Sequence, residues 1–157
     1  GDVKAGGNYA ADLLPLKRAK EAGFGTTLYL DAKERKYIEE FSVSNFLGIS
    51  STGAYVTPSS GSILPSITNQ MLMQLARDRG LEVEQRPVEY AELPSFREVG
   101  ACGTATVVAP VASITGPSGE KLEFHTFDIL NQLRMRLQEV QYGEYEDRHG
   151  WMVEVTC

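Results

Sequence analysis

The chain has 157 residues, of which 42% are hydrophobic and 23% are charged, and its formal net charge is −6 at pH 7. These values are typical of one globular domain that buries its own core. The acidic balance argues against nucleic acid or an anionic membrane surface as a partner, because both require clustered lysine and arginine. The sequence contains no run of about 18 apolar residues, which is the length that a membrane-spanning helix needs, and no secretory leader is visible.

The two cysteines, Cys102 and Cys157, stand far apart and imply no disulfide framework, which favours a reducing, cytoplasmic compartment. Together with His125 and His149 they show no spacing that is typical of a zinc site. We therefore expect no metal.

The N-terminal stretch, residues 1–9, places Lys4 ahead of a Gly-Gly pair, Asn8 and Tyr9. Paired glycines allow the backbone to approach other atoms closely. A desolvated lysine in such a place loses its proton more easily and can form a Schiff base with a carbonyl group. The alternative is an exposed lysine in a frayed terminus.

Apolar residues at helical spacing predict a helix over residues 9–22, with a kink or a helix start near Pro15. Residues 26–31, 37–40, 44–50 and 54–57 are rich in β-formers and predict an antiparallel meander, with a hairpin turn at 51–53.

A loop at residues 58–62 leads into a predicted helix over 67–79, with Ser66 or Thr68 as its N-cap and Gly80 at its end. Residues 81–88 predict a strand and residues 90–97 a short helical or turn segment. Strands are expected within 99–114 and at 122–124, followed by an amphipathic helix over 127–142. The pattern indicates a mixed α+β or α/β domain without a clean βαβ repeat, and it contains no dinucleotide or P-loop motif.

Three further features could bind a ligand. Glu40, at the end of an apolar strand, could pair with a buried cation such as a protonated ring nitrogen, or it could be a solvated surface carboxylate. The helix start at residues 64–68 could bind an anion, or it could be an ordinary N-cap. The small residues 103–105 could bring backbone amides to an anion, or they could pack a strand crossing. A lysine, a carboxylate and two anion sites together match the needs of pyridoxal phosphate.

Five motifs occur in order along the chain: Lys4–Tyr9 (KAGGNY), Tyr37–Glu40 with Asn45 and Phe46, Gly61–Thr68 (GSILPSIT), Cys102–Ala105 (CGTA), and Gln141–Gly143 (QYG) with Gly150 and Trp151. This series resembles the branched-chain amino acid aminotransferases, which are fold-type IV pyridoxal-phosphate enzymes. The resemblance covers nearly the whole chain. It implies the large domain of the D-amino acid aminotransferase-like fold, an antiparallel-rich pseudo-barrel with flanking helices.

The resemblance also implies residue roles. Lys4 would bind the cofactor covalently and move the substrate proton, and Glu40 would pair with the pyridinium nitrogen. Tyr9 would lie near the phenolic oxygen of the cofactor, and Leu64 would pack on its ring. The remaining contacts would come from Ile67, Thr68 and Thr104 to the phosphate, and from Val43, Thr104 and Ala105 to the substrate.

The sequence departs from the family pattern at several points. Residues 66–69 read Ser-Ile-Thr-Asn where many members have Gly-Ile-Thr-Arg, and Glu40 is followed by Phe41-Ser42. Residues 106–109 contain no cysteine, so thiol regulation of the kind that some relatives have there is not expected. Family members carry an N-terminal small domain before the lysine motif, so residues 1–157 are expected to be the cofactor-binding large domain alone.

The implied activity is transamination of leucine, isoleucine and valine with 2-oxoglutarate, by a homodimer when the whole enzyme is present. The isolated chain is expected to be inactive, because half of its pocket would be missing. Two alternatives stay open: another fold-type IV activity, either D-amino acid transamination or aminodeoxychorismate lysis, and a folded domain without catalysis.

Overall fold

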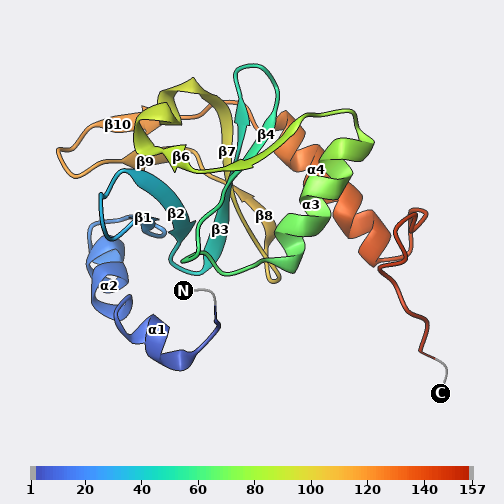
Figure 1. Ribbon diagram of the computed structural model, residues 1–157, viewed down its shortest axis with the longest axis horizontal. Helices are drawn as coiled ribbons and strands as arrows, with labels where there is room; N and C mark the ends of the chain where they lie inside the picture. The colour runs from blue at the N-terminus through green and yellow to red at the C-terminus, as the bar shows by residue number, and fades with distance from the viewer. Residues whose placement is uncertain (1–2, 156–157) are drawn as a thin grey trace.

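The centre of the molecule is a strongly bent sheet (Figure 1). A computed structural model of the chain describes residues 3–155. The strands of the sheet are β1 (Leu28–Leu30), β2 (Tyr37–Phe41), β3 (Ser44–Ser50), β4 (Tyr55–Pro58), β5 (Val83–Arg86), β6 (Val88–Glu89), β7 (Phe96–Gly103) and β8 (Val107–Pro110). Strands β1 to β4 are neighbours in chain order, as the predicted meander describes. A separate two-stranded ribbon consists of β9 (Ser113–Thr115) and β10 (Lys121–Glu123).

The helices are α1 (Gly6–Ala10), α2 (Leu13–Glu21), α3 (Ile67–Asp78) and α4 (Asp128–Gln141), with a 3₁₀ helix, η1, at Tyr90–Ser95. Strand β3 is the hub, since it pairs antiparallel with β2, β4 and β7. The parallel pair is β4 with β5, and the chain between these two strands forms α3. The predicted mixed α+β fold, an antiparallel-rich sheet with flanking helices, is confirmed.

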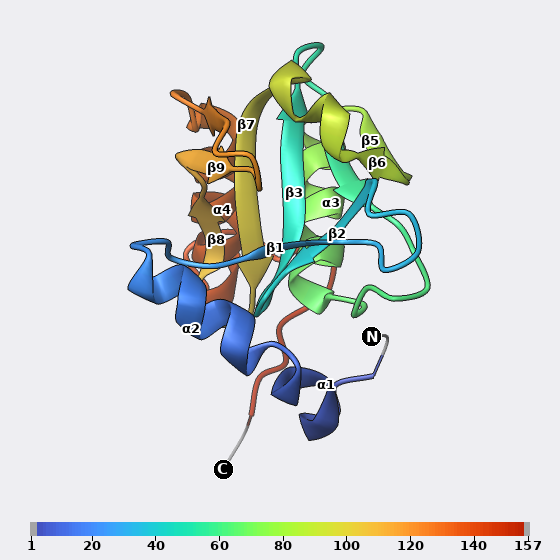
Figure 2. The same cartoon turned by 90° about the vertical axis from the view of Figure 1, so that its left-hand side faces the viewer.

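Two apolar clusters hold the sheet from its two faces. Helices α3 and α4 lie side by side on one face (Figures 1 and 2), where Leu72 and Leu133 pack with Leu47 of β3. On the other face, Phe46 of β3 packs with Ile38 and with residues from η1, β7 and β9. The apolar faces of α3 and α4 are therefore buried against the sheet, as their period predicts, whereas α1 and α2 have no buried residue.

Two predicted elements divide in the structure. The helix expected over 9–22 is two helices, and the break falls at Ala11 and Asp12. Pro15 is the third residue of α2. The N–H groups of the first turn have no acceptor within the helix, so a proline there costs no helical hydrogen bond. The strand expected over 81–88 divides into β5 and β6 at Pro87, which cannot donate to a strand ladder. The strand region 99–114 is β7, a turn at 104–106, β8 and the start of β9.

A buried carboxylate begins α4. Glu98 of β7 is 1% exposed and accepts the backbone N–H groups of Ile129 at 3.1 Å and Leu130 at 2.9 Å. Phe127, at the N-cap position, makes no side-chain capping bond. The free amides of the first turn are thus satisfied from the neighbouring strand, and the positive end of the helix faces the carboxylate.

Replacing Glu98 by alanine is expected to lower the free energy of unfolding by about 2–4 kcal/mol, because two buried N–H groups lose a charged acceptor. Glu98→Gln retains one acceptor oxygen and should recover part of the loss. Urea denaturation measures both variants. Equal stability of Glu98→Ala and the wild-type protein would show that water replaces the carboxylate at no cost.

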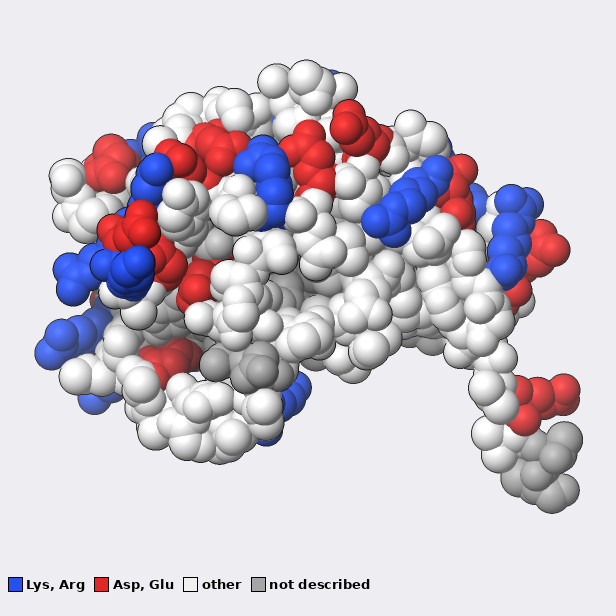
Figure 3. All heavy atoms as spheres, in the orientation of Figure 1, with Lys and Arg blue, Asp and Glu red and all other residues white. Residues whose placement is uncertain are grey.

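The surface carries both signs of charge. Acidic and basic side chains are interspersed along the upper part and the left-hand side of the face drawn in Figure 3, and the lower centre of this face is largely uncharged. Within residues 3–155, no helix combines the length and the apolar character that are needed to cross a membrane.

Candidate active site

Five of the predicted site residues line one cleft of about 620 Å³. They are Lys4, Tyr9, Glu40, Val43 and Leu64. The cleft lies between the α1–α2 segment and the edge of the sheet formed by β1, the β2–β3 turn and the 62–64 loop. The space-filling view shows a hollow between that segment and the body of the molecule, with an acidic side chain in it (Figure 3). The fold thus brings the segment with Lys4 and Tyr9 to the same cleft as Glu40 of β2.

The Gly-Gly-Asn motif shapes the backbone around Lys4. Asn8 Nδ2 donates to Val3 O at 2.8 Å, and the N–H of Ala5 donates to the same oxygen at 2.9 Å. The N–H of Asn8 donates to Ala5 O at 3.0 Å. Lys4 therefore lies inside a small loop that Asn8 closes. Its side chain is exposed, and Tyr9 on α1 is half-buried.

Glu40 is held by neighbours on β3 and the 62–64 loop. It pairs in register with Asn45, whose Nδ2 donates to Glu40 Oε2 at 3.4 Å and to Leu64 O at 3.0 Å. Burial in the cleft raises the pKa of Glu40, and repulsion from Glu39 adds to this, while a hydrogen bond from the Leu64 backbone opposes it. A carboxylate whose ionisation is costly gains from a cation placed beside it.

The start of α3 has the free donors that the sequence predicts. Ser66 is the N-cap, and its Oγ accepts the N–H of Asn69 at 3.1 Å, while Ser66 O accepts that of Gln70 at 3.1 Å. The amides of Ile67 and Thr68 precede these and have no acceptor within the helix. The Ile67 side chain is 69% exposed and lies in a shallow groove with Met71 and Trp151. Neither Ile67 nor Thr68 is among the residues that line the cleft.

Thr104 and Ala105 form an exposed turn between β7 and β8 and do not line the cleft in this structure. They follow Gly103, where a methyl group in place of the α-hydrogen would lie 3.9 Å from both Ser44 Cβ and Val43 O. The turn therefore begins beside the cleft edge that carries Val43. Cys102 before it is fully buried, and burial raises the pKa of its thiol to about 12.

A buried polar network, which the sequence did not predict, fixes the first turn of α3 on the sheet. The Tyr55 hydroxyl donates to Asn69 Oδ1 at 2.6 Å, and Asn69 Nδ2 donates to Thr57 Oγ1 at 3.0 Å. Thr57 Oγ1 in turn donates to Phe46 O at 2.9 Å. Asn69, which the sequence marks only as a departure from a family arginine, orients the helix start. Its partners on β4 become visible only once the strand register is known.

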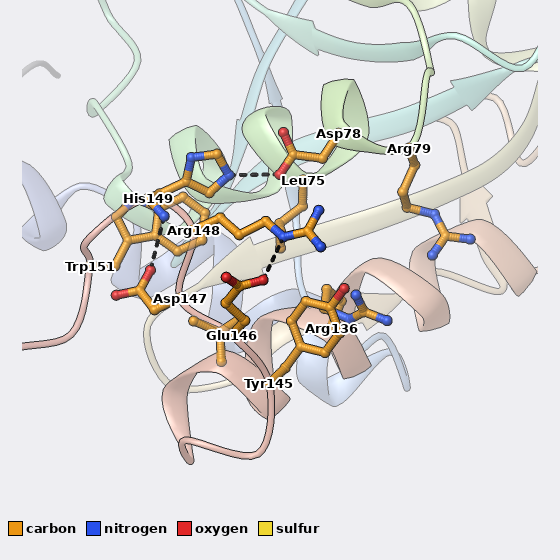
Figure 4. Close-up of a pocket in the computed structure, with 11 residues that line it drawn as sticks. Leu75, Asp78, Arg79, Arg136, Tyr145, Glu146, Asp147, Arg148, His149 and Trp151 are labelled. Carbon is orange, nitrogen blue, oxygen red and sulfur yellow. Dashed lines mark hydrogen bonds and ion pairs between the residues drawn. The ribbon is translucent and has the colours of Figure 1, made fainter.

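Another hollow, of about 90 Å³, lies between α3, α4 and the 145–151 segment (Figure 4). His149 Nε2 lies 2.6 Å from Asp78 Oδ2, and the His149 ring stacks on Trp151 with centroids 4.7 Å apart. The Arg136 guanidinium lies 3.5 Å from the centre of the Tyr145 ring. The predicted site residues do not line this hollow, and its contacts fasten the C-terminal segment to the two helices.

In residues 3–155, no group of three or more His, Cys, Asp or Glu residues could hold a metal ion. Cys157 lies outside the described residues.

Known proteins resemble this chain over most of its length. The family model described as amino-transferase class IV matches residues 3–114. The branched-chain-amino-acid aminotransferase of Haemophilus influenzae is 41% identical over 168 aligned positions, which cover 99% of this chain and 48% of that protein.

Two solved structures show the same fold. The Escherichia coli branched-chain amino acid aminotransferase superposes with a TM-score of 0.84 at 29% identity, over 98% of this chain and 50% of that one. The Thermobaculum terrenum branched-chain amino acid aminotransferase, solved in its PLP form, gives 0.80 at 32% identity, over 97% and 48%. The chain spans about half the length of these relatives.

Proposed function

Because the chain belongs to the class IV aminotransferase family, we propose that it is the cofactor-binding part of a branched-chain L-amino acid aminotransferase that uses pyridoxal phosphate. The observation that supports this is the cleft that places Lys4, Tyr9 and Glu40 together. Lys4 supplies an amine that can react with a carbonyl group, Tyr9 supplies a phenol, and Glu40 supplies a carboxyl group with a raised pKa. Relatives named for this activity match nearly the full length of the chain.

The residues present fit pyridoxal phosphate. The Lys4 amine would bind the aldehyde carbon of the cofactor, and Glu40 would pair with the ring nitrogen. This ion pair would offset the free-energy cost of ionising the buried Glu40 carboxyl group. Tyr9 would lie near its phenolic oxygen, and Leu64 would pack on the ring. The free amides at the start of α3, from Ile67 and Thr68, would supply an anion site for the phosphate, with Thr104 as a further donor, although these residues do not line the cleft in this structure.

When bound, pyridoxal phosphate supplies an electron-withdrawing ring that accepts the electrons released by loss of the substrate Cα proton. Glu40 would hold the ring nitrogen in its protonated form. The Lys4 amine would accept the proton from the substrate Cα and return it to C4′ of the cofactor. The amides of Thr104 and Ala105 would bind the substrate carboxylate, and Val43 would lie on the substrate side.

The second substrate would be 2-oxoglutarate, which takes the amino group and leaves as glutamate. We propose that residues 1–157 correspond to the large domain of a longer, cytoplasmic, homodimeric enzyme, since the relatives are about twice as long as the matched region. The isolated 157 residues, with the remainder of the pocket missing, are then expected not to transaminate leucine at the rate of the complete enzyme.

Substrate turnover by the complete protein with pyridoxal phosphate tests the proposal. We expect L-leucine, L-isoleucine and L-valine to be converted to their 2-oxo acids with 2-oxoglutarate as acceptor, and D-alanine to be ignored. Activity confined to D-alanine, or release of pyruvate from aminodeoxychorismate, would assign the chain to another fold-type IV activity. If no substrate turns over and the cofactor is not retained, the domain is non-catalytic.

A further inference from the structure

The segment that carries the lysine is poorly anchored by apolar contacts. Neither α1 nor α2 contributes a buried residue over its described range, and Leu13 and Leu14 are 68% and 55% exposed. Helices are usually held by an apolar stripe that packs on a core. Something else must therefore keep this segment against the sheet.

Asp12, between the two helices, makes the polar contacts that can do this. Its Oδ1 accepts the hydroxyl of Tyr29 in β1, and its Oδ2 accepts the hydroxyl of Ser42 in the β2–β3 turn. Both contacts join residues far apart in sequence, and the three side chains line the same cleft. One carboxylate thus ties the helical segment to two parts of the sheet.

The position of Asp12 in the sequence suggests a helix cap, but its side chain makes other contacts. Asp12 stands at the N-cap of α2, where an aspartate normally accepts an N–H group from the first turn. Here it makes no side-chain capping bond. Its carboxylate turns away from its own helix, so the contacts to Tyr29 and Ser42 replace the cap instead of adding to it.

Both hydroxyl partners line the cleft, and Ser42 stands next to the predicted site residue Val43. Ser42 lies between Glu40 and Val43, and its N–H donates to Thr27 O at 3.1 Å, which fixes the turn to the chain before β1. On the other side, the N–H of Asp12 donates to Tyr9 O at 3.2 Å. The chain from Lys4 to Tyr9 is therefore connected to the Glu40 strand through Asp12.

We propose that Asp12 is a positioning residue, whose carboxylate holds the Lys4–Tyr9 segment in register with Glu40 by joining Tyr29 and Ser42. The proposal rests on the proposed function for its catalytic consequence, while its structural part stands independently. A lysine that must reach both substrate and cofactor loses rate when its backbone shifts by about 1 Å. Asp12 would act on the rate of proton transfer more than on amino acid binding.

Hydrogen–deuterium exchange of the complete protein without cofactor tests the structural part. Asp12→Ala should speed exchange in peptides from residues 9–16 at least fivefold, because the segment is released from the sheet. Peptides from β3 should keep the wild-type rate, which shows that the variant is folded. Glu21→Ala, which removes an exposed carboxylate from the same segment, is the matched control and should leave both rates unchanged.

Kinetics with L-leucine test the catalytic part. Asp12→Ala should lower kcat about tenfold with KM within twofold. Asp12→Asn keeps one acceptor and gains a donor, so it should stay within about threefold of the wild-type kcat. In the Tyr29→Phe/Ser42→Ala background, Asp12→Ala should add less than twofold, because its partners are already gone.

Unchanged exchange in residues 9–16, or an undiminished effect of Asp12→Ala in the double-variant background, would overturn the proposal. If the wild-type protein does not convert leucine, the proposed function is contradicted. The exchange difference between Asp12→Ala and the wild-type protein still decides the structural role of Asp12.

Discussion

Replacing Lys4 by alanine is expected to abolish transamination of L-leucine, with a loss of at least about a thousandfold. Under the proposed function, the same amine binds the cofactor covalently and carries the proton between Cα and C4′. The remaining lysines cannot substitute for it, because within the described chain Lys4 is the lysine that lines the cleft with Tyr9 and Glu40.

The covalent attachment can be measured without relying on activity. After borohydride reduction of the loaded protein, the peptide that contains Lys4 should gain the mass of the cofactor. In Lys4→Ala that mass should be absent from every peptide. Lys17→Ala, on α2 and 72% exposed at its side chain, is the control and should retain both the mass and the activity. Cofactor fixed to a different lysine would remove Lys4 from its proposed role.

Glu40→Gln is expected to lower kcat/KM for L-leucine about a hundredfold, because a neutral amide does not hold a proton on the ring nitrogen. Cofactor affinity should fall with it. Glu34→Gln, in the exposed β1–β2 turn, changes a carboxylate in the same way without reaching the cleft and serves as the control. Equal activity of Glu40→Gln and the wild-type protein would exclude the ion pair.

The same variant should raise the stability of the protein without cofactor, and the effect should depend on pH. Burial raises the pKa of Glu40 above its ordinary value of 4.5, so the folded state disfavours the ionised form. The penalty is absent below pH 4.5 and grows as the pH rises through the folded-state pKa. We expect Glu40→Gln to raise Tm by about 1–3 °C at pH 7 and by nothing at pH 4. Thermal unfolding at both pH values measures this, and a Tm that falls at pH 7 would contradict it.

Much of this fold follows from local patterns. The 3.6-residue apolar period of α3 and α4, the Ser66 cap and the β2–β3–β4 meander depend on neighbours in sequence, and these predictions are confirmed. The break at Ala11 and Asp12 is not predicted by the sequence, and the Asp12 side chain finds its partners in β1 and the β2–β3 turn. Periodicity within residues 9–22 carries no information about those distant hydroxyls.

The candidate site divides in the same way. Lys4, Glu40 and the start of α3 were identified by residue type and by resemblance, and the structure brings Lys4 and Glu40 to one cleft. The contact of the motif residue Asn45 with Glu40 and the Tyr55–Asn69–Thr57 network could not be identified, since both depend on strand register and burial. Ile67, Thr68, Thr104 and Ala105 lie outside the cleft lining, and their contacts with phosphate and substrate stay predictions.

Cys102 gives the chain a chemical property that its sequence does not suggest. A thiol with a pKa of about 12 has almost no thiolate at neutral pH, and thiolate is the form that attacks peroxides and disulfides. Cys102 also lies inside β7, paired in register with Asn45 of β3 and Val108 of β8. Oxidants can reach it only when these strands separate. The turn at Thr104 and Ala105 can therefore follow a cysteine by two residues and still be insensitive to oxidative stress for as long as the sheet is intact.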